Sequence, residues 1–194
     1  MEYERLYADM MLKLKEGLSP NLYYHGLHHT LDVLAALTEI SKHENVSGTP
    51  LLLLKTAALL HDSGFTETFA DHEEAGCRIT REMLPTYGYS ANDIDIICGM
   101  IMSTKIPQTP DNKLEEIICD ADLDYLGRDD FYPISHSLFK ELVFRGAIID
   151  ENEWNKLQVK FLSAHHYFTG TCQNLREANK QLRIEEIKQL IQNA

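Results

Sequence analysis

LLLLKTAALLHDSG, residues 51–64, is the stretch of sequence that decides the fold. It is apolar on nearly every side for three turns, which is typical of a helix buried at the centre of a protein. The apolar run leads directly into His61-Asp62 and is followed by Gly64, where we predict that the helix ends. A buried helix that ends in an imidazole and a carboxylate places polar chemistry inside the predicted core.

Helical signals continue on both sides of this segment. We predict that Thr49 is the N-cap of the central helix, with Pro50 at its first position. Asp71 and Glu74 have the spacing of a capping box, as do Asp150 and Glu153. The periodicity of apolar residues and these start signals predict further helices over 2–16, 26–43, 71–84, 112–126 and 173–192, and others from Ser90 and Asp150.

The chain is predicted to be an all-α protein with one domain over residues 1–194. Its 194 residues are long enough to bury a core. The hydrophobic content of 44% and the charged content of 25% are near the globular average. We find no segment with a convincing strand period, no repeat and no long linker. The last two helices are expected to form a lid or an interface, and the latter would allow a homodimer.

Charge and targeting signals restrict the partners. With 18 Lys and Arg against 30 Asp and Glu, the net charge of −12 disfavours binding to long nucleic acid. A small phosphorylated ligand stays compatible with it if local cations outweigh the global field. We expect no membrane partner, because no apolar run could span a bilayer and the amino-terminal segment has no signal-peptide pattern. Four cysteines without a CxxC pair indicate reduced thiols and a cytoplasmic protein.

Histidines and carboxylates are the residues that suggest chemistry. His25 and His29 are four apart, so they would share one face of a helix that begins by about residue 24. His61-Asp62 ends the apolar helix, and Asp122 lies in another apolar stretch, IICDADLDYLG. A buried carboxylate without a partner costs several kcal/mol, roughly 2–7 for a polar group and more for a charge. A divalent metal would satisfy both carboxylates, and imidazole with carboxylate is a common ligand mixture.

The ordered set His, then His-Asp, then Asp resembles the HD superfamily of metal-dependent phosphohydrolases. The pieces are YHGLHHTLDVL, LLHDSG and CDADLDYLG, which span about residues 23–130. The resemblance implies an all-α HD core over this range and a helical extension over about 131–194. It also implies one or two divalent metals, with Mn, Mg, Fe, Co, Ni and Zn all compatible, and hydrolysis of a small phosphate ester, often a nucleotide.

The resemblance also implies roles for single residues. His29, His61, Asp62 and Asp122 match the metal ligands, with His28 as a competing choice for the first of them. His25 resembles the donor of a proton to the leaving group, and His72 matches a further histidine that serves a second metal or the phosphate. A later histidine of two-metal members is missing from MIMSTKIP, where Lys105 is a candidate source of positive charge.

Other interpretations stay open from the sequence. His25 could simply cap or pack against the helix start, His72 could lie on the surface, and Lys105 could be a solvated loop lysine. Two other functions are compatible with the same motifs: an HD-type di-iron oxygenase, which His72 suggests, and a non-catalytic module that senses a nucleotide and signals through the charged carboxy-terminal helix.

Overall fold

A computed structural model describes residues 1–192, and this part of the chain contains helices and no strands. The all-α prediction is therefore confirmed. The α-helices are α1 (Tyr3–Gly17), α2 (Leu27–His43), α3 (Gly48–Leu60), α4 (His72–Met83), α5 (Ala91–Ser103), α6 (Lys113–Asp122), α7 (Phe131–Phe144), α8 (Glu151–Ala164) and α9 (Gly170–Gln192). Short 3-10 turns follow α3, α4 and α6: η1 (Ser63–Thr66), η2 (Leu84–Tyr87) and η3 (Asp124–Gly127).

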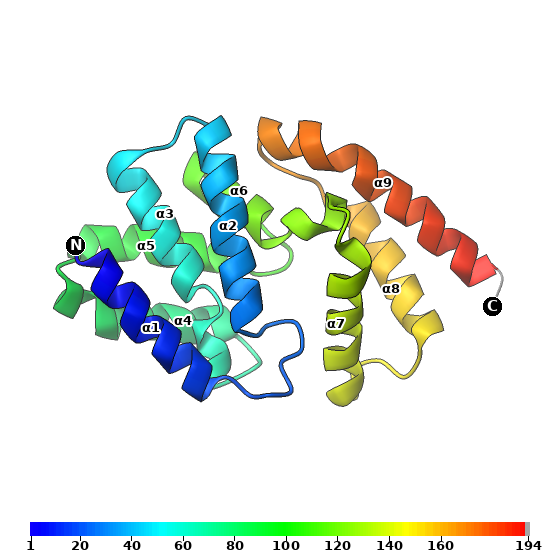
Figure 1. The fold of residues 1–194 in the computed structure, drawn as a ribbon, viewed down its shortest axis with the longest axis horizontal. Coiled ribbons are helices and arrows are strands. Elements are labelled where there is room, and N and C mark those ends of the chain that lie inside the picture. The colour runs from blue at the N-terminus through cyan, green and yellow to red at the C-terminus, as the bar shows by residue number, and fades with distance from the viewer. Residues whose placement is uncertain (193–194) are drawn as a thin grey trace.

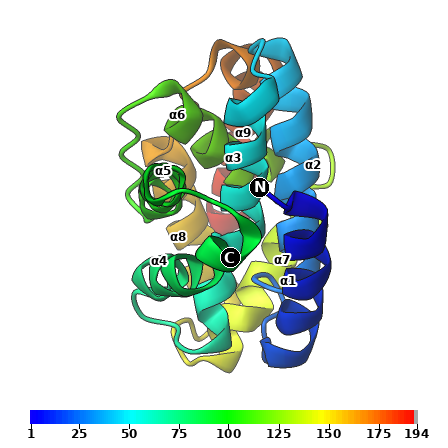
Figure 2. The same ribbon diagram turned by 90° about the vertical axis from the view of Figure 1, so that its left-hand side faces the viewer.

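Helix α3 is the central element, as its apolar sequence predicts. It packs against α1, α2, α5 and α6, which surround it (Figures 1 and 2). Its residues Leu53, Leu54 and Ala57–Leu60 are all buried. From Thr56 onward every residue of the helix is buried, which explains the lack of a polar stripe there and fixes the position of the residues that follow Leu60.

One predicted helix start is wrong, and a second start, at Asp71, is correct but lacks the predicted capping box. Helix α3 begins at Gly48 with Ser47 as N-cap, so Thr49 is not the cap and Pro50 is the third helical residue. Gly48 has a φ of +62°. Glycine adopts this angle without steric cost, and the helix therefore begins two residues earlier than expected. Asp71 precedes α4 in the left-handed region, with a φ of +54°. Its side chain cannot take the usual capping position from that backbone conformation.

The capping prediction holds for α8. Asp150 accepts a hydrogen bond from the Glu153 amide at 2.8 Å, but the Glu153 carboxylate returns to the Ile149 amide at 2.9 Å and not to that of Asp150. Helix α6 is shorter than predicted, because it ends at Asp122 and the chain continues as η3. Asp122 therefore lies at a helix end, as His61 and Asp62 do.

Helices α7–α9 form a layer beside the α1–α6 bundle (Figure 1). A buried carboxylate attaches them: Asp120 accepts from the Phe168 amide at 2.9 Å, from the Thr169 amide at 2.8 Å and from the Thr169 hydroxyl at 2.6 Å. Arg176 of α9 donates to Asp124 of η3 at 2.7 Å. These contacts place the carboxy-terminal layer at a defined position against the end of α6.

None of the described helices has the length and apolarity needed to cross a membrane. The cysteines Cys77, Cys98, Cys119 and Cys172 are free thiols.

A core truncation tests the central role of α3. Leu54 is fully buried. We expect Leu54→Ala to lower the free energy of unfolding by about 2–5 kcal/mol through lost burial and a residual cavity. Leu12 of α1 is 56% exposed. Leu12→Ala should change the free energy of unfolding by no more than about 0.5 kcal/mol. Urea unfolding of both variants measures the difference, and equal effects would contradict the buried position of α3.

Candidate metal centre

Three side chains from three helical segments converge at the end of α3. His29 Nε2 lies 3.0 Å from Asp122 Oδ1 and 3.4 Å from His61 Nε2. His61 Nε2 lies 3.5 Å from the same oxygen of Asp122. One ligand atom from each of the three residues lies within 4.8 Å of the others, so they could hold a metal ion.

Asp62 completes this group. Its Oδ2 lies 3.3 Å from His61 Nε2 and 3.5 Å from His29 Nε2. The Oδ2 atom is buried and has no hydrogen-bond partner among the described residues. A carboxylate oxygen left in this state is costly unless a cation meets it, so the atom marks the point where an ion would be bound.

The competing ligand, His28, does not join the group. His28 lines a surface hollow with Asp32 and Pro133. His29 also borders this hollow, but its Nε2 lies within 3.5 Å of His61, Asp62 and Asp122. The two side chains diverge because successive residues of a helix with 3.6 residues per turn point about 100° apart. The convergence therefore involves His29.

Backbone contacts orient the ligand from α3. His61 follows the last residue of the helix, and its Nδ1 lies 2.8 Å from the Ala58 carbonyl oxygen, one turn back. With the Nδ1 proton donated to that carbonyl, Nε2 is the ring nitrogen that faces the cluster, and it could bind a metal ion on loss of its own proton. The buried helix thus fixes both the position and the tautomer of this imidazole.

The electrostatics of the cluster are those of a cation site. Burial opposes charge on Asp62, yet the neighbouring His61 outweighs it and holds the pKa of that carboxyl well below its ordinary value. Burial likewise opposes the charge of Asp122, but hydrogen bonds from His29 and His61 lower its pKa to about 2. Both carboxylates are therefore ionised at neutral pH and attract a cation.

The four residues fit a divalent metal. Ligand atoms bound about 2.0–2.2 Å from one ion lie roughly 3.0–3.5 Å apart. The distances from His29 Nε2 and His61 Nε2 to each other and to the nearest oxygens of Asp62 and Asp122 run from 3.0 Å to 3.5 Å. Two imidazole nitrogens and two carboxylate oxygens suit several first-row ions. His29, His61, Asp62 and Asp122 would hold the metal.

His25 lies beside the site, but in a loop and not on the predicted helix face. Helix α2 begins at Leu27, so His25 lies in the preceding loop and does not share a helix face with His29. Its Nδ1 lies 2.5 Å from Glu141 Oε1, and the amides of Tyr24 and His25 donate to Glu141 Oε2 at 2.8 and 3.1 Å. Glu141 of α7 is fully buried. Burial opposes its charge, but the imidazole and the amides outweigh this and hold its pKa below the ordinary value.

Sequence analysis did not identify Glu141. It lies 116 residues after His25, in α7, a helix that the sequence analysis did not predict. A buried carboxylate that binds Nδ1 leaves Nε2 free to act on a substrate. No helix was predicted over Phe131–Phe144, so a single Glu in a largely apolar stretch was the available signal.

His72 approaches the cluster from the start of α4. Its Nε2 lies 3.5 Å from Asp62 Oδ1 and 3.4 Å from Glu73 Oε1. Burial opposes its charge, but Asp62 outweighs this and raises the pKa of His72. Phe65 stacks on His72 with a 3.9 Å centroid separation and on His25 with 4.5 Å, so one aromatic ring orients both imidazoles.

Lys105 is not brought to the cluster. Its Nζ donates to Asp71 at 2.8 Å and to Glu74 at 2.7 Å, and the side chain is 38% exposed. The same contacts explain the failed capping box, because both carboxylates of the predicted box bind this ammonium group. Thr104 and Ile106, on either side of Lys105, do line the cavity described next.

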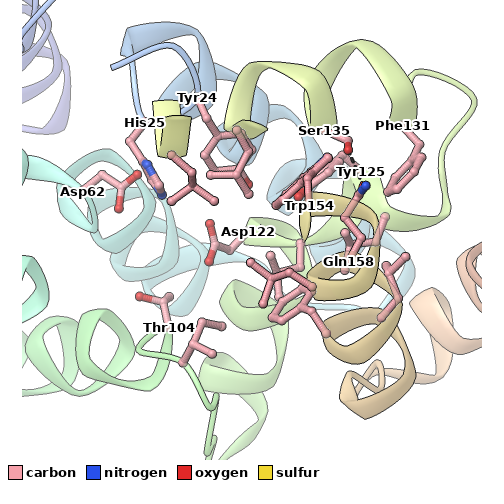
Figure 3. A pocket seen from close by; sticks show the side chains of 18 of the residues that line it. Tyr24, His25, Asp62, Thr104, Asp122, Tyr125, Phe131, Ser135, Trp154 and Gln158 are labelled. Atoms are coloured by element: carbon pink, nitrogen blue, oxygen red, sulfur yellow. Dashed lines mark hydrogen bonds between the residues drawn. The ribbon is translucent and has the colours of Figure 1, made fainter. Parts of the chain in front are cut away.

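A cavity of about 250 Å³ opens from the cluster towards α7 and α8 (Figure 3). Asp62, His72, Glu73 and Asp122 line its polar end, together with His25. Apolar and aromatic side chains of η3, α7 and α8 line the rest. Two candidate ligands, Asp62 and Asp122, and the imidazoles of His25 and His72 thus face one space that a small molecule could enter.

Comparison with known proteins identifies the family. A model of the HD domain matches residues 26–124, just over half of the chain. The chain belongs to the HD domain family. The match covers all four candidate ligands of this HD domain, and it supports the metal-dependent hydrolase class that the motif resemblance implies.

Two solved structures share the fold of this HD protein. A predicted HD superfamily hydrolase from an uncultured Thermotogales bacterium has a TM-score of 0.63 at 21% identity, over 96% of this chain and 91% of its own. A protein from Lactobacillus plantarum has a TM-score of 0.67 at 16% identity, over 100% of both chains. The second alignment includes the carboxy-terminal layer of the HD protein as well as its HD core. No curated protein matches the sequence.

Removal of one ligand tests the metal centre. We expect Asp122→Ala to lose the metal, because the variant removes one of the two carboxylate ligands. The affinity for the metal should fall by more than the roughly 10–100-fold that is typical when a residue outside the ligand set is changed. Elemental analysis after dialysis against Mn²⁺ and the Mn²⁺-dependent rise in Tm measure this loss. Asp111→Ala, at an exposed carboxylate, is the control and should bind metal like the parent.

Glu141→Gln tests the orientation of His25. For a substrate that the protein hydrolyses, kcat should fall by about 10–100-fold, a loss comparable to the rate contribution of general acid–base catalysis. KM, metal content and Tm should change little. In a His25→Ala background the same change should have no further effect, because the two residues act as one unit. Additive losses in the double variant would contradict this pairing.

Proposed function

We propose that this HD protein is a metal-dependent phosphohydrolase that cleaves a small phosphate ester or a nucleotide. The observation that supports it most is the convergence of two imidazoles and two ionised carboxylates at the polar end of a cavity. A bound divalent ion would supply a water of lowered pKa and charge for the phosphoryl oxygens. Hydrolysis of a phosphate ester uses both.

The other residues at the polar end support acid–base roles. His25 holds its Nδ1 proton on Glu141, so its Nε2 can donate a proton to the leaving oxygen of the ester. His72 and Glu73 lie 3.4 Å apart beside Asp62 and can accept the proton of the attacking water. Phe65 keeps the imidazoles of His25 and His72 in place. The proposal gives Lys105 no role, because two carboxylates already bind it.

A di-iron oxygenase is a second candidate that one observation favours. His72 Nε2 lies 3.5 Å from Asp62 Oδ1, while Asp62 Oδ2 faces the first cluster, so this carboxylate could bridge two ions. Elemental analysis after anaerobic purification distinguishes the two functions. A content of about two iron ions per chain, together with oxygen uptake, would support an oxygenase in place of a hydrolase.

Phosphate release tests the proposed function directly. We expect purified protein with Mn²⁺, Mg²⁺ or Co²⁺ to release phosphate from at least one member of a panel of phosphomonoesters and nucleotides. Asp62→Asn should abolish release while the protein stays folded by circular dichroism, since it removes a ligand charge at nearly constant volume. A folded sample that releases no phosphate with any of these metals would contradict hydrolysis.

A further inference from the structure

The inner part of the cavity has a wall unlike its polar end. Beyond the cluster it is lined by side chains of α7 and α8 (Figure 3), among them Phe131, Leu138, Leu142, Trp154, Leu157 and Phe161. These residues come entirely from the carboxy-terminal layer. A small-molecule site with such a lining derives most of its affinity from apolar contact, and a few polar groups set the orientation.

The polar groups within this wall bind each other. Ser135 of α7 donates to Gln158 Oε1 of α8 at 2.5 Å, and Gln158 Nε2 donates to Asn155 at 3.2 Å. Recognition of a nucleobase requires free hydrogen-bond donors and acceptors in the protein that face the edge of the base. Ser135 and Gln158 could supply them only by breaking their hydrogen bond to each other, which would leave buried polar groups unpaired. The inner wall therefore offers little to the polar edge of a base.

Charge around the cavity is also unsuited to a polyphosphate. Within residues 1–192, the lining contains no Lys or Arg, while it does contain Asp62, Glu73 and Asp122. A divalent ion at the cluster would balance the negative charge of its two carboxylate ligands, and it could bind the oxygens of one phosphoryl group. The additional phosphates of a nucleoside triphosphate would have no side-chain cation to contact, since Lys105 is bound to Asp71 and Glu74.

We propose that the substrate is a phosphate monoester of an apolar alcohol, with its single phosphoryl group at the His29–His61–Asp62–Asp122 cluster and its alkyl or aryl group against α7 and α8. This inference rests on the proposed function and narrows its substrate class. Water attacks phosphorus, the bond between phosphorus and the ester oxygen breaks, and the leaving oxygen takes a proton from His25. The products are the free alcohol and inorganic phosphate.

Binding can be measured without turnover. Trp154 is the single tryptophan of the chain and lines the cavity, so its fluorescence reports occupancy. The probes are n-alkylphosphonic acids with two to eight carbons, whose C–P bond is not hydrolysed, titrated in the presence of Mn²⁺. We expect a saturable change in fluorescence and an affinity that rises about fourfold per methylene until the cavity is filled. AMP and ATP should bind more weakly than the hexyl compound.

A charged substitution at the cavity wall provides a second measurement. Leu157 lines the cavity and is 42% exposed. An Arg at this position can therefore be accommodated with its charge in solvent. We expect Leu157→Arg to lower the affinity for hexylphosphonic acid relative to ATP by at least about tenfold. Leu182→Arg is the matched control: Leu182 is 52% exposed and lies outside the cavity, and this variant should behave like the parent.

The outcomes separate this inference from the proposed function. Affinity that does not depend on chain length, or tighter binding of ATP than of hexylphosphonic acid, overturns the apolar substrate class even if phosphate is released from other esters. Chain-length-dependent binding supports that class even if no ester in the panel is hydrolysed, a result that would contradict only the hydrolytic reaction. Equal effects of Leu157→Arg and Leu182→Arg would count against the proposed location of the alkyl group.

Discussion

The imidazoles of His29 and His61 and the carboxylates of Asp62 and Asp122 converge at the end of the buried helix α3, and the surrounding packing depends on this convergence. Unpaired carboxylates at the end of a buried helix would destabilise the fold by several kcal/mol each, within a range of roughly 2–7 or more. Their proximity to His29 and His61 relieves part of that cost, and a divalent ion would relieve more. The apolar surroundings of α3 in turn keep His61 and Asp62 in one orientation, so the geometry of the candidate metal centre depends on the central packing.

The functional site extends beyond the segment that the HD domain model matches. That match ends at residue 124, whereas Glu141 and the apolar wall belong to α7 and α8. The buried hydrogen bonds from Phe168 and Thr169 to Asp120 attach this layer two residues away from Asp122. The HD core thus contributes the candidate ligands, and the carboxy-terminal layer contributes the partner of His25 and the surface that would select a substrate.

The cavity combines two environments that favour different parts of one ligand. Its polar end holds ionised carboxylates and imidazoles, which suit a cation and a phosphoryl group. Its inner wall holds leucine and aromatic side chains, with Ser135 and Gln158 paired to each other. Burial of an apolar group there would contribute about 0.8 kcal/mol per methylene, so substrate selection and chemistry would be located on different helices.

The sequence by itself determined the all-α class, the central position of α3 and the order of the four candidate ligands, because these follow from local periodicity and from motifs on single segments. It could not determine that His25 lies before α2, that Asp71 turns away to Lys105, or that Glu141 holds His25. Those contacts join residues 34 to 116 positions apart, and no local pattern encodes such a distance. Only the packing of α7 and α8 against the core decided the apolar wall, since a stripe of leucines on a helix looks the same whether it faces a core or a cavity.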